Sequence, residues 1–453
     1  MPPYTPPQDL LSWQQRDLSV LWHPCTQMAE HPDTLPLIPI RSGKGVWLHD
    51  IEGNRYLDAV SSWWTNLFGH AEPRIAQAIA EQALKLEHVM FAGFSHQPGL
   101  ELAEKLVALS PDGLSRVFFA DNGSAAVEVA LKMSFHSHAN QGKPAKTRFI
   151  ALRNSYHGET LGALSMADIP LYRQVYSPLL LEPLFAPSPD YFGKHEHETN
   201  AECALRCADG LEAIIVRHHH EVSALILEPL VQCAGGMRMY HPVYLEQARR
   251  LCSQYGIHLI ADEIAVGFGR TGSFFACEQA AISPDFLCLS KGLTGGFLPM
   301  SAVLTTEPVF ESFLSSERSR GFLHSHSYTG NPLGCAAALA SLAIFSSDNV
   351  LENNRATATH MRRLSEQLEQ HPNIAQVRQT GMIVAFEMAL SDGRPFPAEQ
   401  KRGLRAYRAG LRHGAVLRPL GDILYWMPPY CITPEECEFL YRATAAAIDE
   451  ACA

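Results

Sequence analysis

Short apolar runs alternate with longer segments of helical periodicity over most of the first 350 residues of this chain. Three of these runs end at a charged residue, and they cover residues 223–228, 258–262 and 286–291. Each run is short, rich in branched side chains and bounded by polar or helix-breaking residues, which is typical of buried parallel strands. Ligands of such sheets bind beyond the carboxyl ends of the strands, so we expect Glu228, Asp262 and Lys291 to lie there.

The same patterns predict an α/β fold with a large domain and a smaller α+β domain. Further strands of the large domain are expected at 117–120, 148–152 and 301–306, and helices at 73–88, 98–109, 242–255 and from Ala125 onward. After residue 347 the expected elements are helices at 350–370, 402–413 and beyond 433, and strands at 374–378, 383–387, 415–419 and 423–427, the last two as a pair. A hairpin at 46–58 needs a neighbouring sheet edge, so we expect it to join this C-terminal unit. The sequence predicts three divisions. Residues 71–346 form the large domain, residues 347–453 form the small domain, and residues 1–70 are an N-terminal segment that joins the small domain.

An anion site is predicted where the strand at 117–120 runs through Asn122 into Gly123 and Ser124 and a long helix begins. Free backbone N–H groups, a hydroxyl and the helix dipole meet at such a point and favour a phosphate group. The plain alternative is a serine that only caps the helix.

An amine and an acid at neighbouring strand ends match the needs of pyridoxal phosphate, which requires an imine-forming amine and a partner for its ring nitrogen. The alternative for Glu228, Asp262 and Lys291 is an ion pair or three unrelated charges at strand ends. Tyr156 follows a strand end and precedes His157 and a glycine, which suits a ring stacked on a flat cofactor or a turn with a buried tyrosine. The adjacent Trp63 and Trp64 fit either core packing or the lining of an apolar pocket.

Composition narrows the function classes. An apolar fraction of 46% and a charged fraction of 18% over 453 residues describe a globular protein with a sizeable core. The net charge of −11 without a basic run makes nucleic acid an unsuitable partner. We find neither a secretory signal nor an apolar run of the ~18 residues that a membrane span needs.

Eleven scattered cysteines indicate reduced thiols and a cytoplasmic location. Cys203 and Cys207, with histidines 218–220 downstream, leave a metal site open. No second ligand pair has zinc-like spacing, so we expect no metal.

Six motifs in one order resemble the class III, fold-type I pyridoxal-phosphate aminotransferases over nearly the whole chain. They are Asp121-Asn122-Gly123-Ser124, Tyr156-His157-Gly158, Leu227-Glu228-Pro229, Ala261-Asp262-Glu263, the stretch 267–272 and Ser290-Lys291-Gly292. Further segments at 22–24, 61–64, 88–91, 235–242 and 425–430 resemble the members that move an amino group from S-adenosylmethionine to 8-amino-7-oxononanoate in biotin biosynthesis.

The resemblance implies a role for each matching residue. Lys291 would bind the cofactor and shuttle a proton, Asp262 would pair with the ring nitrogen, and Tyr156 would stack on the ring and face the substrate. Gly123 and Ser124 would bind the phosphate, with His326 and Ser327 completing the cup across the interface of a homodimer. Trp63, Trp64, Ser325, Arg418 and Cys25 would contact substrate, and Glu228 and Arg270 would lie in the pocket region with no assigned role.

Two positions depart from the family pattern. Cys25 stands where a tyrosine is common, and Glu159 stands where many members have aspartate. Both bear on how the amino donor binds. The alternatives left open are another class III ω-amino-acid or diamine transaminase, the same acceptor with lysine as donor, and a cofactor-binding protein without catalysis.

Overall fold

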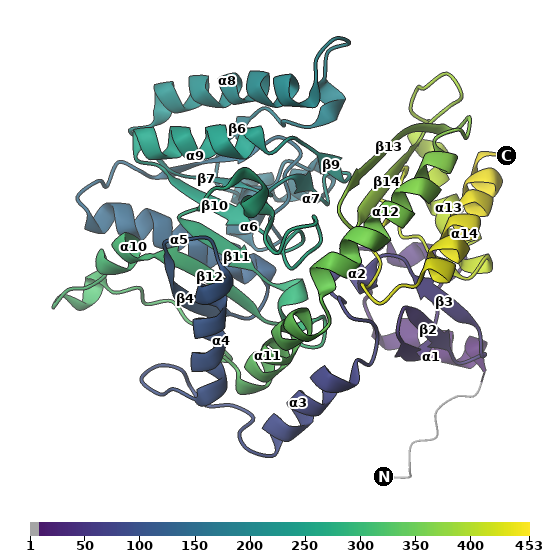
Figure 1. Cartoon of the computed structure of the whole chain (residues 1–453), viewed down its shortest axis with the longest axis horizontal. Coiled ribbons are helices and arrows are strands. Elements are labelled where there is room, and N and C mark those ends of the chain that lie inside the picture. The colour runs from purple at the N-terminus through teal and green to yellow at the C-terminus, as the bar shows by residue number, and fades with distance from the viewer. Residues whose placement is uncertain (1–8) are drawn as a thin grey trace. The chain divides into compact units, whose positions relative to one another are not determined.

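The computed structural model describes residues 9–453, which divide into two compact units (Figure 1). The first, here the sheet unit, comprises residues 73–355 and 379–383. The second, here the terminal unit, comprises residues up to Glu72 together with 356–378 and 384–453.

A seven-stranded sheet forms the sheet unit, with the order β4-β12-β11-β10-β7-β5-β6. The strands are β4 (Leu114–Ala120), β5 (Arg148–Leu152), β6 (Leu184–Ala186), β7 (Val222–Leu227), β10 (His258–Asp262), β11 (Phe286–Leu289) and β12 (Ser301–Thr306). The pairs from β11 to β6 are parallel, and β12 lies antiparallel to both of its neighbours. The expected mainly parallel sheet is therefore confirmed.

Helices cover both faces of this sheet because its crossovers run in two directions. Helix α5 (Gly123–Asn140) carries the chain from β4 to β5, whereas α9 (Val243–Tyr255) carries it back from β7 to β10. Right-handed crossovers of opposite direction place their helices on opposite faces. Helix α8 (Asn200–His218) packs beside α9 on the second face (Figure 1).

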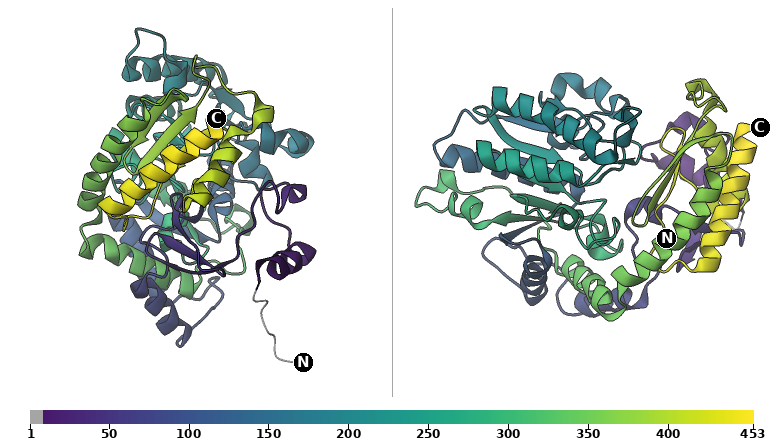
Figure 2. Two further views of the ribbon diagram at one scale, coloured as in Figure 1. Left: turned by 90° about the vertical axis from the view of Figure 1, so that its right-hand side faces the viewer. Right: turned by 45° about the horizontal axis from the view of Figure 1, so that its top comes forward.

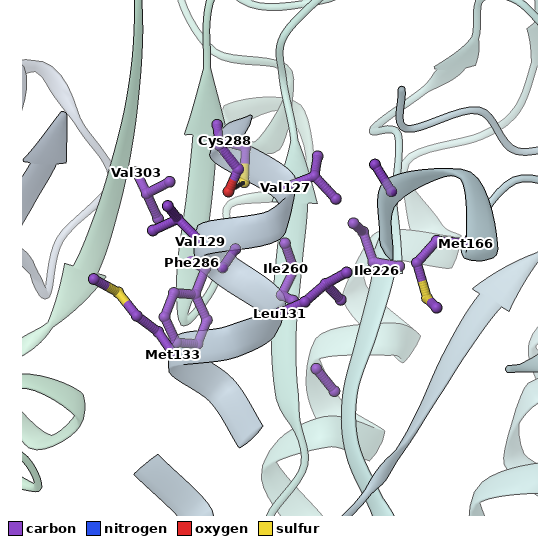
Figure 3. Close-up of a cluster of buried hydrophobic side chains, with 14 of the residues drawn as sticks. Val127, Val129, Leu131, Met133, Met166, Ile226, Ile260, Phe286, Cys288 and Val303 are labelled. Carbon is purple, nitrogen blue, oxygen red and sulfur yellow. Dashed lines mark hydrogen bonds between the residues drawn. The ribbon is translucent and has the colours of Figure 1, made fainter. Parts of the chain in front are cut away.

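The core of the sheet unit lies between α5 and the strands (Figure 3). Val127, Leu131 and Met133 of α5 lie among buried side chains from six strands, β4, β5, β7, β10, β11 and β12. Those labelled in Figure 3 include Ile226, Ile260, Phe286, Cys288 and Val303. Ala224 and Ile226 of β7 belong to this cluster. Leu225 and Leu227, which alternate with them and face the other side of the sheet, are also fully buried. Burial on both faces explains why these strands are continuous apolar runs.

The remaining elements of the sheet unit connect or flank these layers. They are α3 (Pro73–Ala83), α4 (Gln97–Leu109), α6 (Leu161–Ser165), α7 (Pro170–Arg173), β8 (Val231–Gln232), β9 (Arg238–Met239), α10 (Glu307–Glu311), α11 (Pro332–Ser347) and the 3-10 turns η2 (Gln174–Leu179), η3 (Tyr191–Gly193), η4 (Ala276–Ala280), η5 (Lys291–Thr294) and η6 (Arg318–Arg320).

The terminal unit contains two small sheets, β1-β2-β3-β15 and β13-β14-β16. Its strands are β1 (Ile40–Lys44), β2 (Trp47–Asp50), β3 (Arg55–Asp58), β13 (Ile374–Thr380), β14 (Ile383–Met388), β15 (Ala415–Val416) and β16 (Ile423–Trp426). Its helices are α1 (Leu10–Val20), η1 (Met28–Glu30), α2 (Ser61–Trp64), α12 (Val350–Leu368), which begins in the sheet unit, η7 (Ala398–Gln400), α13 (Arg402–Arg412) and α14 (Pro434–Cys452). Helices α13 and α14 lie side by side (Figure 2).

One strand pairing was predicted wrongly. The segments around β15 and β16 were expected to form a pair, but β15 lies parallel to β3 and β16 lies antiparallel to β14. The two strands thus belong to different sheets, and the residues between them carry the chain from one sheet to the other. The early hairpin does join this unit, because β15 adds to the edge of β3.

Helix α2 is a left-handed turn. All four residues from Ser61 to Trp64 have positive φ, between 45° and 72°. Such a backbone costs about 1–2 kcal/mol per L-residue, so neighbouring contacts must hold it. The buried Ser61 hydroxyl donates to the carbonyl of Met427 at 2.7 Å, and the Ser62 hydroxyl donates to Asp58 at 2.8 Å.

Within residues 9–453 no single helix is long and apolar enough to cross a membrane, although the bent pair α11 and α12 meets the requirements of length and composition.

Candidate active site

Three predicted residues meet at the carboxyl edge of the large sheet. Ala261 of β10 lies opposite Leu227 of β7, so Asp262 and Glu228 follow at the same level. Strand β11 lies on the other side of β10 and leads through Ser290 to Lys291. Parallel strands of matching register therefore bring two acids and an amine to one edge, as the sequence predicts.

Lys291 opens the turn η5 in the left-handed region, with φ of 43°. Burial lowers the pKa of its amine, and the nearby Cys233, Asp262 and Glu228 oppose this shift. A lowered pKa increases the fraction of unprotonated amine, which is the form that attacks an aldehyde carbon.

Asp262 is held in place by two donors. Its Oδ2 lies 2.7 Å from Nδ1 of His157, whose side chain is fully buried, and its Oδ1 accepts from the N–H of Ile264 at 3.1 Å. The sequence motif contained His157, but its role was missed. Its place directly after Tyr156 at a strand end was the indication available.

Glu228 is 5% exposed and connects two loops. One carboxylate oxygen accepts from the N–H of Tyr156 and the other from the N–H of Cys233, each at 3.0 Å. Burial raises the pKa of this carboxyl group to about 7. Both of these donors are main-chain N–H groups, whereas Asp262 bonds to one main-chain N–H and to the His157 ring.

The predicted anion site is a helix N-terminus with a fixed shape. Asn122 caps α5 through the N–H of Ala125, which leaves the first-turn N–H groups of Gly123 and Ser124 without an intrahelical partner. The Ser124 hydroxyl accepts from the N–H of Glu159 at 3.1 Å. A Cβ on Gly158 would lie 2.1 Å from that hydroxyl, and the φ of Gly158 is +120°, so only glycine fits at this approach.

The segment that carries Ser325, His326 and Ser327 lies between η6 and α11. Ser325 and Ser327 are exposed, and Nδ1 of His326 lies 3.7 Å from a carboxylate oxygen of Asp121 in the same chain. The N–H of His326 donates to the Thr329 hydroxyl at 3.0 Å.

The terminal unit brings two of its predicted residues together. The guanidinium of Arg418 lies 4.6 Å from the centroid of the Trp63 ring, which is 40% exposed. Trp64 is instead buried and donates its ring N–H to the Tyr425 hydroxyl at 3.0 Å. Cys25 is exposed and has positive φ.

The residues of the sheet unit fit pyridoxal phosphate. The N–H groups of Gly123 and Ser124 offer a phosphate site, and Gly158 keeps the adjacent turn clear of a side chain. The Asp262 carboxylate is oriented by His157, and the amine of the partly buried Lys291 has the lowered pKa that imine formation needs. Donor, acceptor and nucleophile are the three kinds of group that this cofactor requires.

The cysteine pair on α8 contacts main-chain oxygens. Cys203 donates to the carbonyl of Asp190 and Cys207 to that of Ser188. In the described part of the chain no group of three or more histidine, cysteine or acidic side chains has the geometry to hold a metal ion.

Comparison with known proteins defines the class. The family model for class-III aminotransferases matches residues 28–448, and this chain belongs to that family. As in the rest of the family, its cofactor is pyridoxal 5'-phosphate. The chain is an aminotransferase.

The relatives narrow the comparison. The adenosylmethionine-8-amino-7-oxononanoate aminotransferase of Helicobacter pylori is 46% identical over 96% of this chain and 97% of its own length. That of Geobacter sulfurreducens is 43% identical over 97% of both chains. The crystal structure of the Methanocaldococcus jannaschii enzyme of the same name has a TM-score of 0.90 at 37% identity, covering 96% of this chain and 99% of that one. The ω-transaminase of Pseudomonas jessenii in complex with PMP has a TM-score of 0.91 at 29% identity, covering 97% and 98%.

Proposed function

We propose that this aminotransferase moves the amino group of S-adenosylmethionine to 8-amino-7-oxononanoate and forms 7,8-diaminononanoate, a step of biotin biosynthesis. The observation that carries the chemistry is the partly buried Lys291, whose amine has a lowered pKa, at the strand edge that also holds Asp262. The choice of substrates rests on relatives of that name with 38–46% identity over nearly the full chain.

The chain's own groups account for the chemistry in two stages, with the donor leaving before the acceptor binds. Bound at this site, pyridoxal phosphate supplies the carbonyl carbon that carries the amino group between substrates and a ring that withdraws electrons. Lys291 is the amine that tethers the cofactor and moves a proton at Nζ. Asp262 would accept a charge-assisted hydrogen bond from the protonated ring nitrogen of the cofactor. His157 orients the Asp262 carboxylate for this contact.

The remaining predicted residues are assigned to binding. We assign the phosphate to Gly123 and Ser124, joined by His326 and Ser327 of a second copy in a homodimer. The location of Ser325 and Ser327 on an exposed segment supports this assembly. Tyr156 is assigned to the cofactor ring and the substrate. A cytoplasmic location is likewise a proposal, which rests on the cysteine usage.

Substrate binding is assigned to residues of the terminal unit and to Ser325. Arg418 is proposed to pair with a substrate carboxylate, because a guanidinium matches a carboxylate in a bidentate geometry. Its position over the exposed Trp63 ring supports a site with one charged and one apolar surface. Trp64 then supports Trp63 from the core through its bond to Tyr425, and Cys25 is kept as a contact of the donor.

A second candidate, ω-transamination, is favoured by the structural comparison alone. The ω-transaminase of Thermomicrobium roseum has a TM-score of 0.94, which exceeds the 0.90 of the Methanocaldococcus enzyme. Its sequence identity is only 30%, against 46% for the Helicobacter relative. Because the family shares one backbone fold, the side chains and not the fold decide the substrate, and the higher sequence identity to the Helicobacter relative favours the first proposal.

The test is a donor screen with the purified holoenzyme and 8-amino-7-oxononanoate as acceptor. We expect 7,8-diaminononanoate to form with S-adenosylmethionine and not with lysine or an ω-amino acid. Lys291→Ala should abolish turnover, because no other group replaces its amine in tethering and proton transfer. Efficient amination of ω-ketoacids with no product from 8-amino-7-oxononanoate would establish the second candidate instead.

A further inference from the structure

The turn from Asn154 to Glu159 is held to its surroundings at almost every residue. The N–H of Asn154 donates to Asp168, and the Ser155 hydroxyl donates to the carbonyl of Met166 at 2.7 Å. The N–H of Tyr156 donates to Glu228, His157 bonds to Asp262, and the N–H of Glu159 donates to Ser124. Two of these anchors are the acids at the ends of adjacent strands, so the turn is seated on the sheet edge itself.

Glu228 has no assigned part in catalysis, yet its carboxylate serves both loops at the site. Its two oxygens accept from Tyr156 on the loop after β5 and from Cys233 on the turn between β8 and β9, and its own carbonyl accepts from the Tyr240 hydroxyl at 2.6 Å. A buried carboxylate is costly unless its oxygens are satisfied, and here both are satisfied by main-chain donors. Glu228 is therefore the anchor of the Tyr156 main chain itself, whereas the other anchors hold its neighbours in the turn.

We propose that Glu228 is a positioning residue that sets the place of the Tyr156 ring, and through it the affinity for cofactor and substrate. The inference rests on the proposed function only in that Tyr156 faces the cofactor and the substrate. The Tyr156 hydroxyl donates to Glu159 at 3.0 Å, so the ring is also oriented from its far end by the same turn. Loss of the hydrogen bond from the Tyr156 N–H to Glu228 would shift the end of the Tyr156 side chain that is nearest the sheet.

The chain offers a matched control in Glu263. This side chain is also fully buried, and its carboxylate accepts from the N–H groups of Ala276 and Cys277 at 2.7 and 2.8 Å. Burial raises the pKa of Glu263 to about 7, as it does for Glu228. The two glutamates thus make the same kind of contact, but the loop held by Glu263 contains none of the residues assigned to the site.

The experiment compares Glu228→Gln with Glu263→Gln. Glutamine keeps the shape but directs an amide N–H₂ at one of the two main-chain donors, so both variants should lose similar thermal stability as apoproteins. Only Glu228→Gln should raise the dissociation constant for pyridoxal phosphate and the KM for the acceptor, each by about tenfold, the ratio expected for one lost charge-assisted hydrogen bond. It should also shift the visible absorbance band of the bound cofactor.

A double-mutant cycle tests whether Tyr156 transmits the effect. In a Tyr156→Ala background, Glu228→Gln should change the cofactor dissociation constant by less than about twofold. Additive effects would overturn the proposal, and so would equal changes in the Glu228→Gln and Glu263→Gln variants. If Glu228→Gln does not fold, Glu228→Asp is compared with Glu263→Asp by the same criteria. Failure of the proposed function would appear in the wild-type donor screen, whereas the cofactor titrations do not depend on the identity of the substrates.

Discussion

At the scale of single residues, the most informative contact is the 2.7 Å bond between His157 and Asp262. It fixes one carboxylate oxygen, and the buried Nε2 of His157 has no hydrogen-bond partner among residues 9–453. A carboxylate oxygen only accepts, so Nδ1 of His157 is the donor in this bond and the ring is oriented by Asp262 as much as Asp262 is by the ring.

We predict that His157→Phe weakens cofactor binding and slows the first half-reaction by roughly tenfold or more, because Asp262 loses a buried hydrogen bond to a charged group. His138→Phe is the control, since His138 is equally buried and bonds to the carbonyl of Ser223 at 3.0 Å, at the amino ends of the strands. Cofactor dissociation constants, measured by titrating each apoprotein, should separate the two variants. Equal losses in both would mean that His157 contributes only to folding.

At the scale of elements, the left-handed turn α2 stores strain in the terminal unit. Ser61 has a φ of 49°, and its hydroxyl donates to the carbonyl of Met427. The same residue thus carries both the backbone strain and a hydrogen bond that offsets it. In an ordinary helix, a protein with alanine at a given position is more stable than one with glycine. At Ser61 we expect the opposite order, because glycine has no steric penalty at positive φ.

We predict that Ser61→Ala lowers the free energy of unfolding by about 1–3 kcal/mol, the range for a buried acceptor left without its donor. Ser61→Gly loses the same hydrogen bond but should be more stable than Ser61→Ala by ~1 kcal/mol. Urea unfolding of the two variants and the wild type measures both differences. A more stable alanine variant would show that the turn is not strained at this residue.

At the scale of the whole molecule, a stacked histidine pair, with His138 buried and His258 partly buried, and two buried glutamates act in opposite directions on acid stability. His138 and His258 stack with ring centroids 4.2 Å apart, and burial lowers the pKa of each to about 3. Unfolded histidines take up protons below pH ~6.5 while this folded pair does not, so the pair's contribution to stability falls as pH drops from about 6.5 toward 3. The raised pKa of Glu228 and Glu263 has the reverse effect, since their cost is present above pH 7 and disappears toward pH 4.5.

We predict that His138→Phe makes stability less sensitive to acid. Between pH 6.5 and 4.5 the unfolding free energy of the wild type should fall relative to the variant by about 1.4 kcal/mol per pH unit, the value for one group that titrates only when unfolded. Lys146, whose pKa is lowered to about 8 by burial, stays protonated in this window and does not contribute. His195→Gln at an exposed site is the control and should follow the wild type. If the unfolding free energies of the wild type and His138→Phe changed with pH in parallel, His138 would not be a source of the acid sensitivity.

The sequence by itself determined the parts of this protein that depend on local pattern. Apolar runs that end in Glu228, Asp262 and Lys291 indicated strands with charges at their carboxyl ends, because burial on both faces of a parallel sheet imposes a continuous apolar run. The capped start of α5 at Gly123 was equally local, since an asparagine, a glycine and a serine before a helical period specify a helix N-terminus. The family motifs then linked these strand ends to one chemistry.

Only the tertiary structure decided which strands pair and which side chains meet. Period-two alternation defines the faces of β15 and β16 but not their neighbours, so two short strands separated by only residues 417–422 entered different sheets. The left-handed turn at Ser61 depends on a carbonyl 366 residues away, and the bond from His157 to Asp262 spans 105 residues. Such contacts form because the packed sheet brings distant loops to one edge, and no local pattern of side chains specifies them.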